Sequence, residues 1–265
     1  ASVNTGVFSG SNISVVEWGA SSGDQPMFNP ATGATTNALY AGGDVSTDTK
    51  HFLNAGLMTT AATGVGLFRF VDILGSYPYL NANNAAAQTC FNTNTLPRYT
   101  TGAGVKAFLV SGGTGYVGAA TTVGAGAHTV AMTYTNSGAT GSRQMPFTVN
   151  CTASAIQGHI THSGTAAGNT FPLPLAHGDN GIRSIQSITI GATGTAATYY
   201  HMVLYRELTR IPVPAANVYY EREFLNQVPS LKQVYDGACL GLLYTAAGAT
   251  AASTTFLGHV DFGWS

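Results

Sequence analysis

The sequence predicts an all-β fold, with a β-sandwich or jelly-roll-like domain, on three observations. From residue 66 onward, short segments rich in Val, Ile, Thr, Tyr and Phe recur along the chain, and these residue types favour strands. Clusters of Gly, Asn, Pro and Ser separate the segments and indicate turns. Only one segment has helical periodicity, so the alternation of strands and helices that predicts a parallel sheet is missing.

We expect nine strands in this region, at residues 67–74, 105–110, 128–135, 145–151, 156–161, 182–190, 198–205, 239–244 and 255–262. Within IRSIQSITI, the residues Ile182, Ile185 and Ile188 depart from the two-residue period of a strand. This spacing predicts a β-bulge or burial on both faces. Asp236-Gly237 predicts a turn just before the strand at 239–244.

The two remaining predicted elements are an N-terminal arm and one helix. Residues 1–60 are rich in Gly, Ser, Asn, Ala and Thr and contain one strand-like run, 13–18. We expect an extended arm over residues 1–60, either ordered on another surface or disordered in isolation, and a β-rich domain over 61–265. A short helix is predicted over Ala215–Val228, with Tyr220 and Phe224 on one face and Pro229 at its end.

The composition predicts a subunit of an assembly. Only 8% of the residues are charged and the formal net charge is -1, against roughly 25% charged residues in an average soluble protein. A neutral surface is suited to large protein contacts, because charged groups are costly to desolvate. The ten Lys and Arg residues are spread singly, so no nucleic acid is expected as a partner. The most apolar stretch, 238–252, is interrupted by Gly and Thr, so no membrane is expected either.

Several motifs resemble catalytic or binding sites but lack the context that their chemistry needs. Residues 113–118 read G-x-G-x-x-G, yet glycines occupy the positions where the phosphate-binding helix would follow. Residues 19–23 read G-x-S-x-G without a helix behind them. His159 and His162 are three residues apart, so in a strand they point to opposite faces. Tyr199-Tyr200 and Tyr219-Tyr220 are candidate sugar platforms, although packing is the commoner role. We expect no enzyme, no cofactor and no metal.

Several short segments of the sequence resemble segments of virion structural proteins of tailed bacteriophages. The similarity covers roughly residues 95–265, and the first 90 residues take no part in it. The resemblance implies a non-enzymatic particle component of the capsid-associated cement or decoration type. The segments that carry it are Leu96-Pro97-Arg98-Tyr99 with Gly102-Ala103-Gly104-Val105, Phe171–Leu175, Gly178–Ser184, Glu221–Leu240 and Asp261–Trp264.

Composition and resemblance together predict a decoration protein that binds the outside of an icosahedral phage head. It would be made in the host cytoplasm, would bridge neighbouring major capsid subunits and would stabilise the shell by burying neutral surface. Self-association into a homotrimer is expected, since a trimer matches a capsid three-fold position. Two alternatives remain: a head-fibre or tail protein that binds a host receptor or glycan, and the major capsid protein itself.

Nine residues are candidate interface contacts. Aromatic side chains in the arm are candidate anchors because aromatic residues dominate interface energetics. Charged residues in the β-rich domain are candidate polar contacts. The anchors are Trp18, Phe28 and Tyr40, and the polar candidates are Arg183, Arg206, Arg210, Glu221, Arg222 and Glu223.

Overall fold

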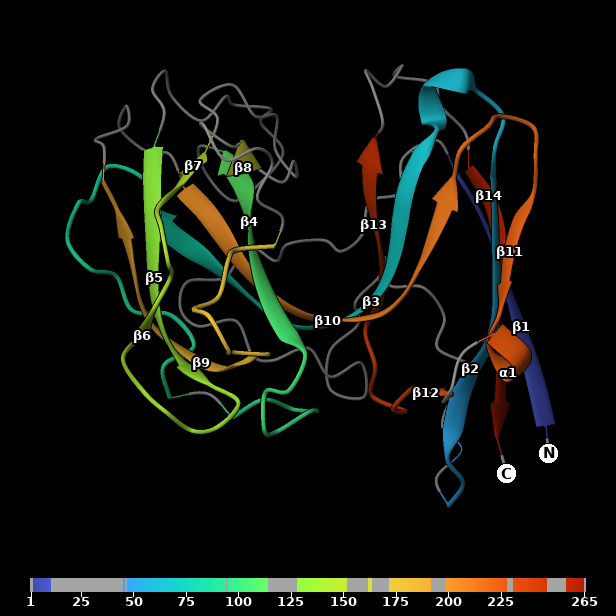
Figure 1. Cartoon of the computed structure of the whole chain (residues 1–265), viewed down its shortest axis with the longest axis horizontal. Helices are drawn as coiled ribbons and strands as arrows, with labels where there is room; N and C mark the ends of the chain where they lie inside the picture. Colours follow the sequence, from blue (N-terminus) through green and yellow to red (C-terminus); the bar gives the residue numbers. More distant parts are fainter. Residues whose placement is uncertain are drawn as a thin grey trace. The chain divides into compact units, whose positions relative to one another are not determined.

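The computed structural model describes residues 2–10, 45, 47–93, 95–113, 128–151, 162–163, 172–191, 199–227, 231–246 and 256–264. Nearly all of its regular structure is β (Figure 1), which confirms the all-β prediction. In chain order the elements are β1 (Ser2–Gly10), β2 (Lys50–Thr59), η1 (Ala62–Gly64), β3 (Gly66–Asn81), β4 (Val105–Gly113), β5 (His128–Asn136), β6 (Arg143–Gln144), β7 (Val149–Cys151), β8 (His162–Ser163), β9 (Ile182–Ile190), β10 (Tyr199–Val213), β11 (Tyr220–Glu223), α1 (Phe224–Gln227), β12 (Lys232–Gln233), β13 (Leu240–Ala246) and β14 (Phe256–Trp264).

The described residues form two compact units, where the sequence predicts one β-rich domain. Unit 1 contains the described residues up to Ile73 and those from Glu207 onward, and unit 2 contains the described residues from Leu74 to Arg206. The long strands β3 and β10 each pass from one unit to the other. Each unit has its own apolar core.

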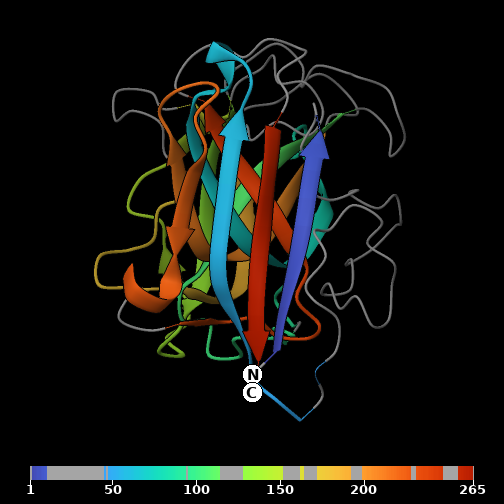
Figure 2. The same ribbon diagram turned by 90° about the vertical axis from the view of Figure 1, so that its right-hand side faces the viewer.

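Unit 1 is built on an antiparallel sheet in the order β1-β14-β2-β11, with β12 also paired to β2. Figure 2 looks onto these strands side by side. Phe52 of β2 lies at the centre of the core. The centroid of its ring is 5.6 Å from that of Phe70, 5.2 Å from that of Phe224 and 5.4 Å from that of Phe262, each in an edge-on arrangement. Such pairs add to the gain from burying the rings.

The position of β2 corrects the predicted arm boundary at residue 60. Residues 50–59 form a strand between β14 and β11, and Phe52, Ala55 and Leu57 are fully buried. The segment KHFLNAGLMT has the alternation of a half-buried strand, which the overall Gly, Ser and Asn content of the first 60 residues obscures. Residues 11–44 of the predicted arm, including the run at 13–18, lie outside the described residues.

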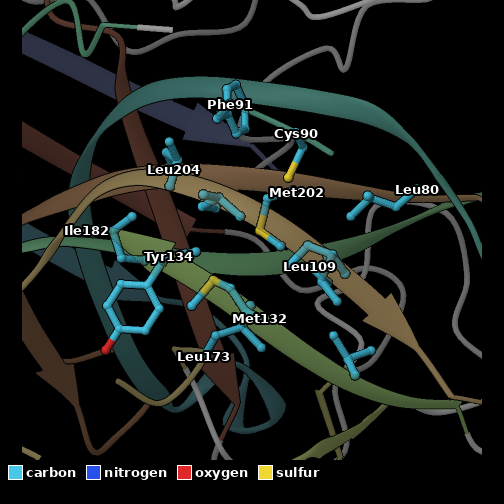
Figure 3. Packing of buried hydrophobic residues seen from close by; sticks show 14 of the residues in the cluster. Leu80, Cys90, Phe91, Leu109, Met132, Tyr134, Leu173, Ile182, Met202 and Leu204 are labelled. Carbon is cyan, nitrogen blue, oxygen red and sulfur yellow. The ribbon is translucent and has the colours of Figure 1, made fainter. Parts of the chain in front are cut away.

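Unit 2 encloses the second core between strands of two sheets. The first half of β10 pairs antiparallel with β4, and β5 pairs antiparallel with β9 on one side and with β6 and β7 on the other. The inward side chains interleave in the core (Figure 3), and the cluster includes Leu109, Met132, Met202 and Leu204. Both units are therefore β-sandwiches, as the sequence predicts for the fold class.

The isoleucine spacing in β9 is explained by two bulges, one of the two alternatives that the sequence left open. The partner register of β9 along β5 skips Gln186 and then Arg183. Each skipped residue restores the inward direction after a three-residue step. Ile182, Ile185 and Ile188 are consequently all fully buried in the same core.

The predicted helix at 215–228 is confirmed only at its end, where α1 spans Phe224–Gln227. Tyr220–Glu223 instead form β11, which pairs antiparallel with β2, and Asn217 has a positive φ of 56°. The backbone groups of β2 need partners along this edge, and pairing with β11 supplies them. Tertiary pairing therefore overrides the helical spacing of Tyr220 and Phe224. The turn predicted at Asp236-Gly237 is confirmed by a hydrogen bond from Ala238 N to Tyr235 O of 2.9 Å.

Candidate functional site

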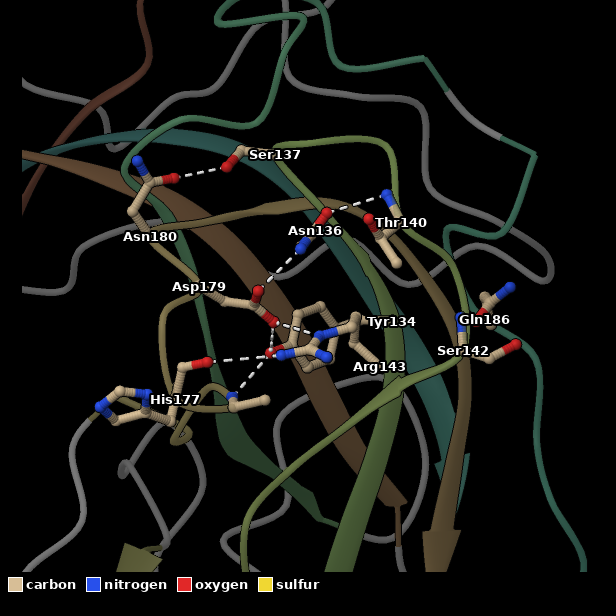
Figure 4. Close-up of polar contacts among 11 residues, drawn as sticks. Tyr134, Asn136, Ser137, Thr140, Ser142, Arg143, His177, Asp179, Asn180 and Gln186 are labelled. Atoms are coloured by element: carbon tan, nitrogen blue, oxygen red, sulfur yellow. Dashed lines mark hydrogen bonds and ion pairs between the residues drawn. The ribbon is translucent and has the colours of Figure 1, made fainter.

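A cluster of polar side chains surrounds Asp179 in unit 2 (Figure 4). The Tyr134 hydroxyl donates to Oδ2 of Asp179 at 2.6 Å, and Arg143 Nε donates to the same oxygen at 2.9 Å. Asn136 Nδ2 donates to Oδ1 at 2.7 Å. The Asp179 side chain is 5% exposed, whereas that of Arg143 is 34% exposed. We call Tyr134, Asn136, Arg143 and Asp179 the Asp179 cluster.

The protonation states follow from this geometry. Burial alone would raise the pKa of Asp179, but the hydrogen bonds from Arg143, Tyr134 and Asn136 outweigh it and lower the pKa to about 2. Burial, together with the hydrogen bond to Asp179, raises the pKa of Tyr134 to about 12. The carboxylate is therefore ionised and the phenol neutral throughout the physiological range.

The chain segments around the Asp179 cluster meet through glycines. Gly102 and Gly104 have φ angles of 78° and 73°, a region that glycine enters at little cost. A Cβ on Gly181 would overlap the carbonyl oxygen of Gly102 and lie 2.7 Å from Gly104 N. Gly104 N donates to Asn180 O at 3.0 Å. Two of the segments that carry the resemblance, 96–105 and 178–184, are thus packed against each other.

Two of the predicted interface arginines belong to this part of unit 2. Arg206 lies over the Tyr99 ring, with its guanidinium carbon 4.2 Å from the ring centroid, and Nη1 donates to Ala103 O at 3.1 Å. Arg183 occupies a bulge of β9 and is exposed. The structure therefore gives Arg206 a packing role and leaves Arg183 accessible.

The remaining polar candidates gather near β11 in unit 1. Arg210 Nε donates to Glu207 Oε1 at 2.6 Å, and Arg222 Nη1 donates to Arg210 O at 3.1 Å. Glu221 accepts a hydrogen bond from Asn54, and Glu223 accepts one from Asn226 at 3.0 Å. Arg210 and Arg222 also line a shallow hollow with Lys232. These contacts place Arg210 beside Arg222, while the register puts Arg222 on the opposite face of β11 from Glu221 and Glu223.

The outer face of the β11-β2-β14 sheet collects carboxylates from separate strands. In the register, Glu223 pairs with Asn54 and Asn54 with Asp261, while Glu221 pairs with Gly56 and Gly56 with His259. Residues that pair across strands share a face. Leu57 and Ala55, the alternate residues of β2, face the core. Glu221, Glu223 and Asp261 therefore lie on the opposite face, which we call the carboxylate face.

An aromatic pair lies on the carboxylate face. Tyr219 is 43% exposed and stacks on His259, with 5.7 Å between the ring centroids and an interplanar angle of 9°. The Tyr219 hydroxyl and Nδ1 of His259 are also hydrogen-bonded to each other. A Cβ on Gly56 would overlap the Tyr219 ring, so the glycine leaves room for it. Nε2 of His259 is 3.6 Å from Asp261 Oδ2. Burial, with the charges of Glu221 and Asp261, raises the pKa of Tyr219.

The sequence analysis missed an ion pair between a buried lysine and a partly exposed aspartate. The side chain of Lys50, at the start of β2, is fully buried, and Nζ lies 3.0 Å from Oδ1 of Asp236. The same oxygen accepts a hydrogen bond from Val45 N at 3.2 Å. These residues lie 186 positions apart in the sequence, so no local pattern pairs them. The ion pair compensates the cost of burying the ammonium group.

Other predicted features lie wholly or largely outside the described residues. Trp18, Phe28, Tyr40 and His159 are among them, as are the G-x-S-x-G motif and all but the first residue of the G-x-G-x-x-G motif. Within the described ranges, no three His, Cys, Asp or Glu side chains are grouped so that they could hold a metal ion. In the same ranges no helix has the length and apolar character needed to cross a bilayer. No family model, curated protein or solved structure matches the chain.

Proposed function

We propose that the chain is a cement or decoration protein of a tailed-phage head, which binds major capsid subunits from outside and holds them together. It would act as a homotrimer and would catalyse no reaction. The proposal rests above all on one observation, the scarcity of charge: 8% of residues. A subunit that must bury much of its surface against neighbours avoids the desolvation cost of charged groups in this way.

The distribution of exposed apolar side chains supports this proposal. Large apolar residues are exposed in both units, with Phe147 at 45%, Val218 at 45%, Leu225 at 58% and Leu257 at 36%. Single exposed apolar residues are ordinary, but here they belong to a chain in which only 8% of the residues are charged. Contacts repeated by symmetry over many copies can hold a shell although each contact is modest.

Two of the segments that carry the resemblance lie against each other in unit 2. Segments 96–105 and 178–184 are brought together by glycine contacts and by the bond between Gly104 N and Asn180 O. Arg206, stacked on Tyr99, ties a third segment to them. These segments therefore contribute to the packing of unit 2.

A receptor- or glycan-binding fibre or tail protein is the second candidate, and the Tyr219–His259 pair favours it. An exposed aromatic ring beside the Glu221 and Asp261 carboxylates combines the apolar platform and the hydrogen-bond acceptors that a sugar requires. A glycan array separates the two candidates. Binding that Tyr219→Ala abolishes would support the glycan reading, and absence of binding would count against it.

Capsid binding is tested with empty heads assembled from the major capsid protein encoded in the same genome. We expect the purified chain to co-sediment with these heads at saturation, with hundreds of copies per particle, and to raise the temperature at which they disrupt. A variant with Leu225→Ser and Phe147→Ser should bind more weakly, because both side chains are exposed in the free chain. Failure of the unmodified chain to bind, or saturation at a handful of copies, would overturn the proposal.

A further inference from the structure

A small hollow in unit 1 is lined by cations from three separate strands. Its walls are formed by Glu207–Arg210 of β10, by Arg222 and Phe224 where β11 meets α1, and by Lys232 of β12, and its volume is about 180 Å³. All of these residues belong to the same unit. Sites for drug-sized ligands begin at roughly 300 Å³. The hollow, which we call the basic hollow, is therefore suited to one small chemical group.

The strand register explains why two of the cations point into the basic hollow. Arg222 pairs with Ala55 of β2, and Lys232 pairs with Phe52 of the same strand. Ala55 and Phe52 are both buried in the core of unit 1, and residues that pair across strands share a face. Arg222 and Lys232 therefore lie on the core-facing side of this sheet, one after the other along the same edge of β2.

The positive charge of the basic hollow is not neutralised within the described part of the chain. The lining has three cations and one carboxylate, a net charge of +2. That carboxylate, Glu207, is already held by two arginines, with Oε1 2.6 Å from Arg210 Nε and Oε2 3.6 Å from Arg69 Nε. Arg222 Nη1 donates to a neutral acceptor, Arg210 O, at 3.1 Å. Neither Arg222 nor Lys232 makes an ion pair with any described residue.

The carboxylates next to Arg222 in the sequence do not enter the basic hollow. Glu221 and Glu223 lie on the carboxylate face, on the other side of β11. Their hydrogen-bond partners there are the amides of Asn54 and Asn226. Their negative charges are therefore directed away from the hollow.

A buried hydroxyl in the wall of the basic hollow lacks a partner. Thr209 lines the hollow and is 6% exposed, and its Oγ1 makes no hydrogen bond within the described structure. Such a group is costly to leave unsatisfied, and a bound water or ion commonly accounts for it. A ligand oxygen at this wall would supply the missing acceptor.

The chemistry of the lining favours an oxyanion with nearly two negative charges. Guanidinium groups offer fixed forks of N–H donors that match phosphate and carboxylate oxygens, and an ammonium group adds a compact point charge. A phosphate monoester carries about -1.5 to -2 at pH 7, which complements the net charge of +2 in the hollow. A carboxylate, with a single negative charge, complements it less well.

We propose that the basic hollow binds one phosphate group, which accepts hydrogen bonds from Arg210, Arg222, Lys232 and the Thr209 hydroxyl. The group is free inorganic phosphate or the phosphate of a monoester, since both present the same charged oxygens. The inference does not rest on capsid binding, so either proposal can fail without the other.

Calorimetric titration of the purified chain gives the first test. The probes are sodium phosphate, glucose 6-phosphate, sodium acetate and glucose, at an ionic strength kept constant with NaCl because salt screens exposed charges. We expect one phosphate per chain with a Kd of about 1 mM or below, acetate at least about tenfold weaker, and no binding of glucose. The tighter of the two phosphate probes identifies the source of the group. No saturable binding of either, or acetate as tight as phosphate, would overturn the proposal.

Charge-neutralising variants test whether the phosphate lies in the basic hollow. Lys232→Gln and Arg222→Gln should each weaken phosphate binding by about tenfold or more, because each removes a hydrogen bond to a charged group. The matched control is Arg183→Gln, the same change at an exposed arginine of unit 2, which should leave the affinity unchanged. Unchanged affinity in both hollow variants would show that these inward cations only protect the sheet edge and would overturn the site. So would an equal loss in the control.

Thr209→Val separates the hydroxyl from the charges. The affinity for phosphate should fall by about three- to tenfold, the effect of one hydrogen bond. Without phosphate, the melting temperature of this variant should equal or exceed that of the unmodified chain, because the unsatisfied hydroxyl is gone. An unchanged affinity would overturn the contact with Thr209. Circular dichroism checks that each variant is folded, and Lys232→Gln changes an exposed side chain and so keeps the test available if another variant unfolds.

Discussion

Replacing Asp179 by Asn tests whether the Asp179 cluster stabilises unit 2. The substitution keeps the size of the side chain but removes its charge. An amide in place of the carboxylate cannot accept from Tyr134, Asn136 and Arg143 at once, since one of its two terminal atoms is a donor. At least one of these partly buried donors is then left without a partner, which is the costly outcome for a hydrogen-bond network.

The structure sets the magnitude in two ways. The fall in the pKa of Asp179 from 3.8 to about 2 corresponds to about 2 kcal/mol of folding free energy. Hydrogen bonds to charged groups contribute about 1.5–3 kcal/mol each, reduced here because the Arg143 side chain is 34% exposed and its charge is screened by water. We therefore expect Asp179→Asn to lower the free energy of unfolding by about 2–3 kcal/mol at pH 7.

The pH dependence distinguishes the carboxylate from a merely well-packed side chain. A lowered folded-state pKa stabilises the protein above the unfolded-state pKa, and this contribution is lost as the pH falls through the folded-state value. The gap between the wild type and Asp179→Asn should be constant above about pH 5 and shrink between about pH 4 and 2. Urea unfolding followed by circular dichroism at stepped pH measures it, with Asp48→Asn as the exposed control. A gap below about 0.5 kcal/mol at pH 7, or one that persists at pH 2, would refute the reasoning.

Three further predictions concern packing. Gly181→Ala should destabilise the protein by more than about 2 kcal/mol, because the neighbouring backbone leaves no room for a Cβ. Gly178→Ala should cost only about 1 kcal/mol, because Gly178 has a φ of 84° but open space around it. Equal shifts of the two variants in thermal unfolding would contradict this prediction. Phe52→Ala should cost about 3–5 kcal/mol in urea unfolding, since the ring is fully buried among three others. Cys90 and Cys239, both buried, should resist alkylation in the native state and react after unfolding, as mass spectrometry of labelled peptides would reveal; rapid native labelling of either would show that its core opens.

Much of the fold was predictable because many strands are determined by the residues within them. The strand predicted at 182–190 coincides with β9, and the bulges are one of the two alternatives that its isoleucine spacing left open. The helix prediction was wrong over most of its length, because β11 pairs with β2, a segment that lies far away in the sequence. The predicted boundary of the arm at residue 60 was wrong for the same reason. The central place of β2 in its sheet depends on pairing with β14, which lies about 200 residues later in the sequence.

The candidate site was predictable only where charges are neighbours in the sequence. Glu221, Arg222 and Glu223 stand out as a local group, and the structure places them together on one strand. The partners of Asp179 are 36 to 45 residues away, so its role needed the fold.

The order of the chain has a consequence for biosynthesis. Unit 2 is encoded between the two stretches that form unit 1, so a ribosome finishes it while β2 still waits for both neighbours, β14 and β11. Until β11 and β14 have been synthesised, β2 exposes Phe52 and Leu57 together with unpaired backbone groups. Such a surface is prone to aggregation. A chain truncated before β14 should therefore aggregate more readily than its small loss of length implies.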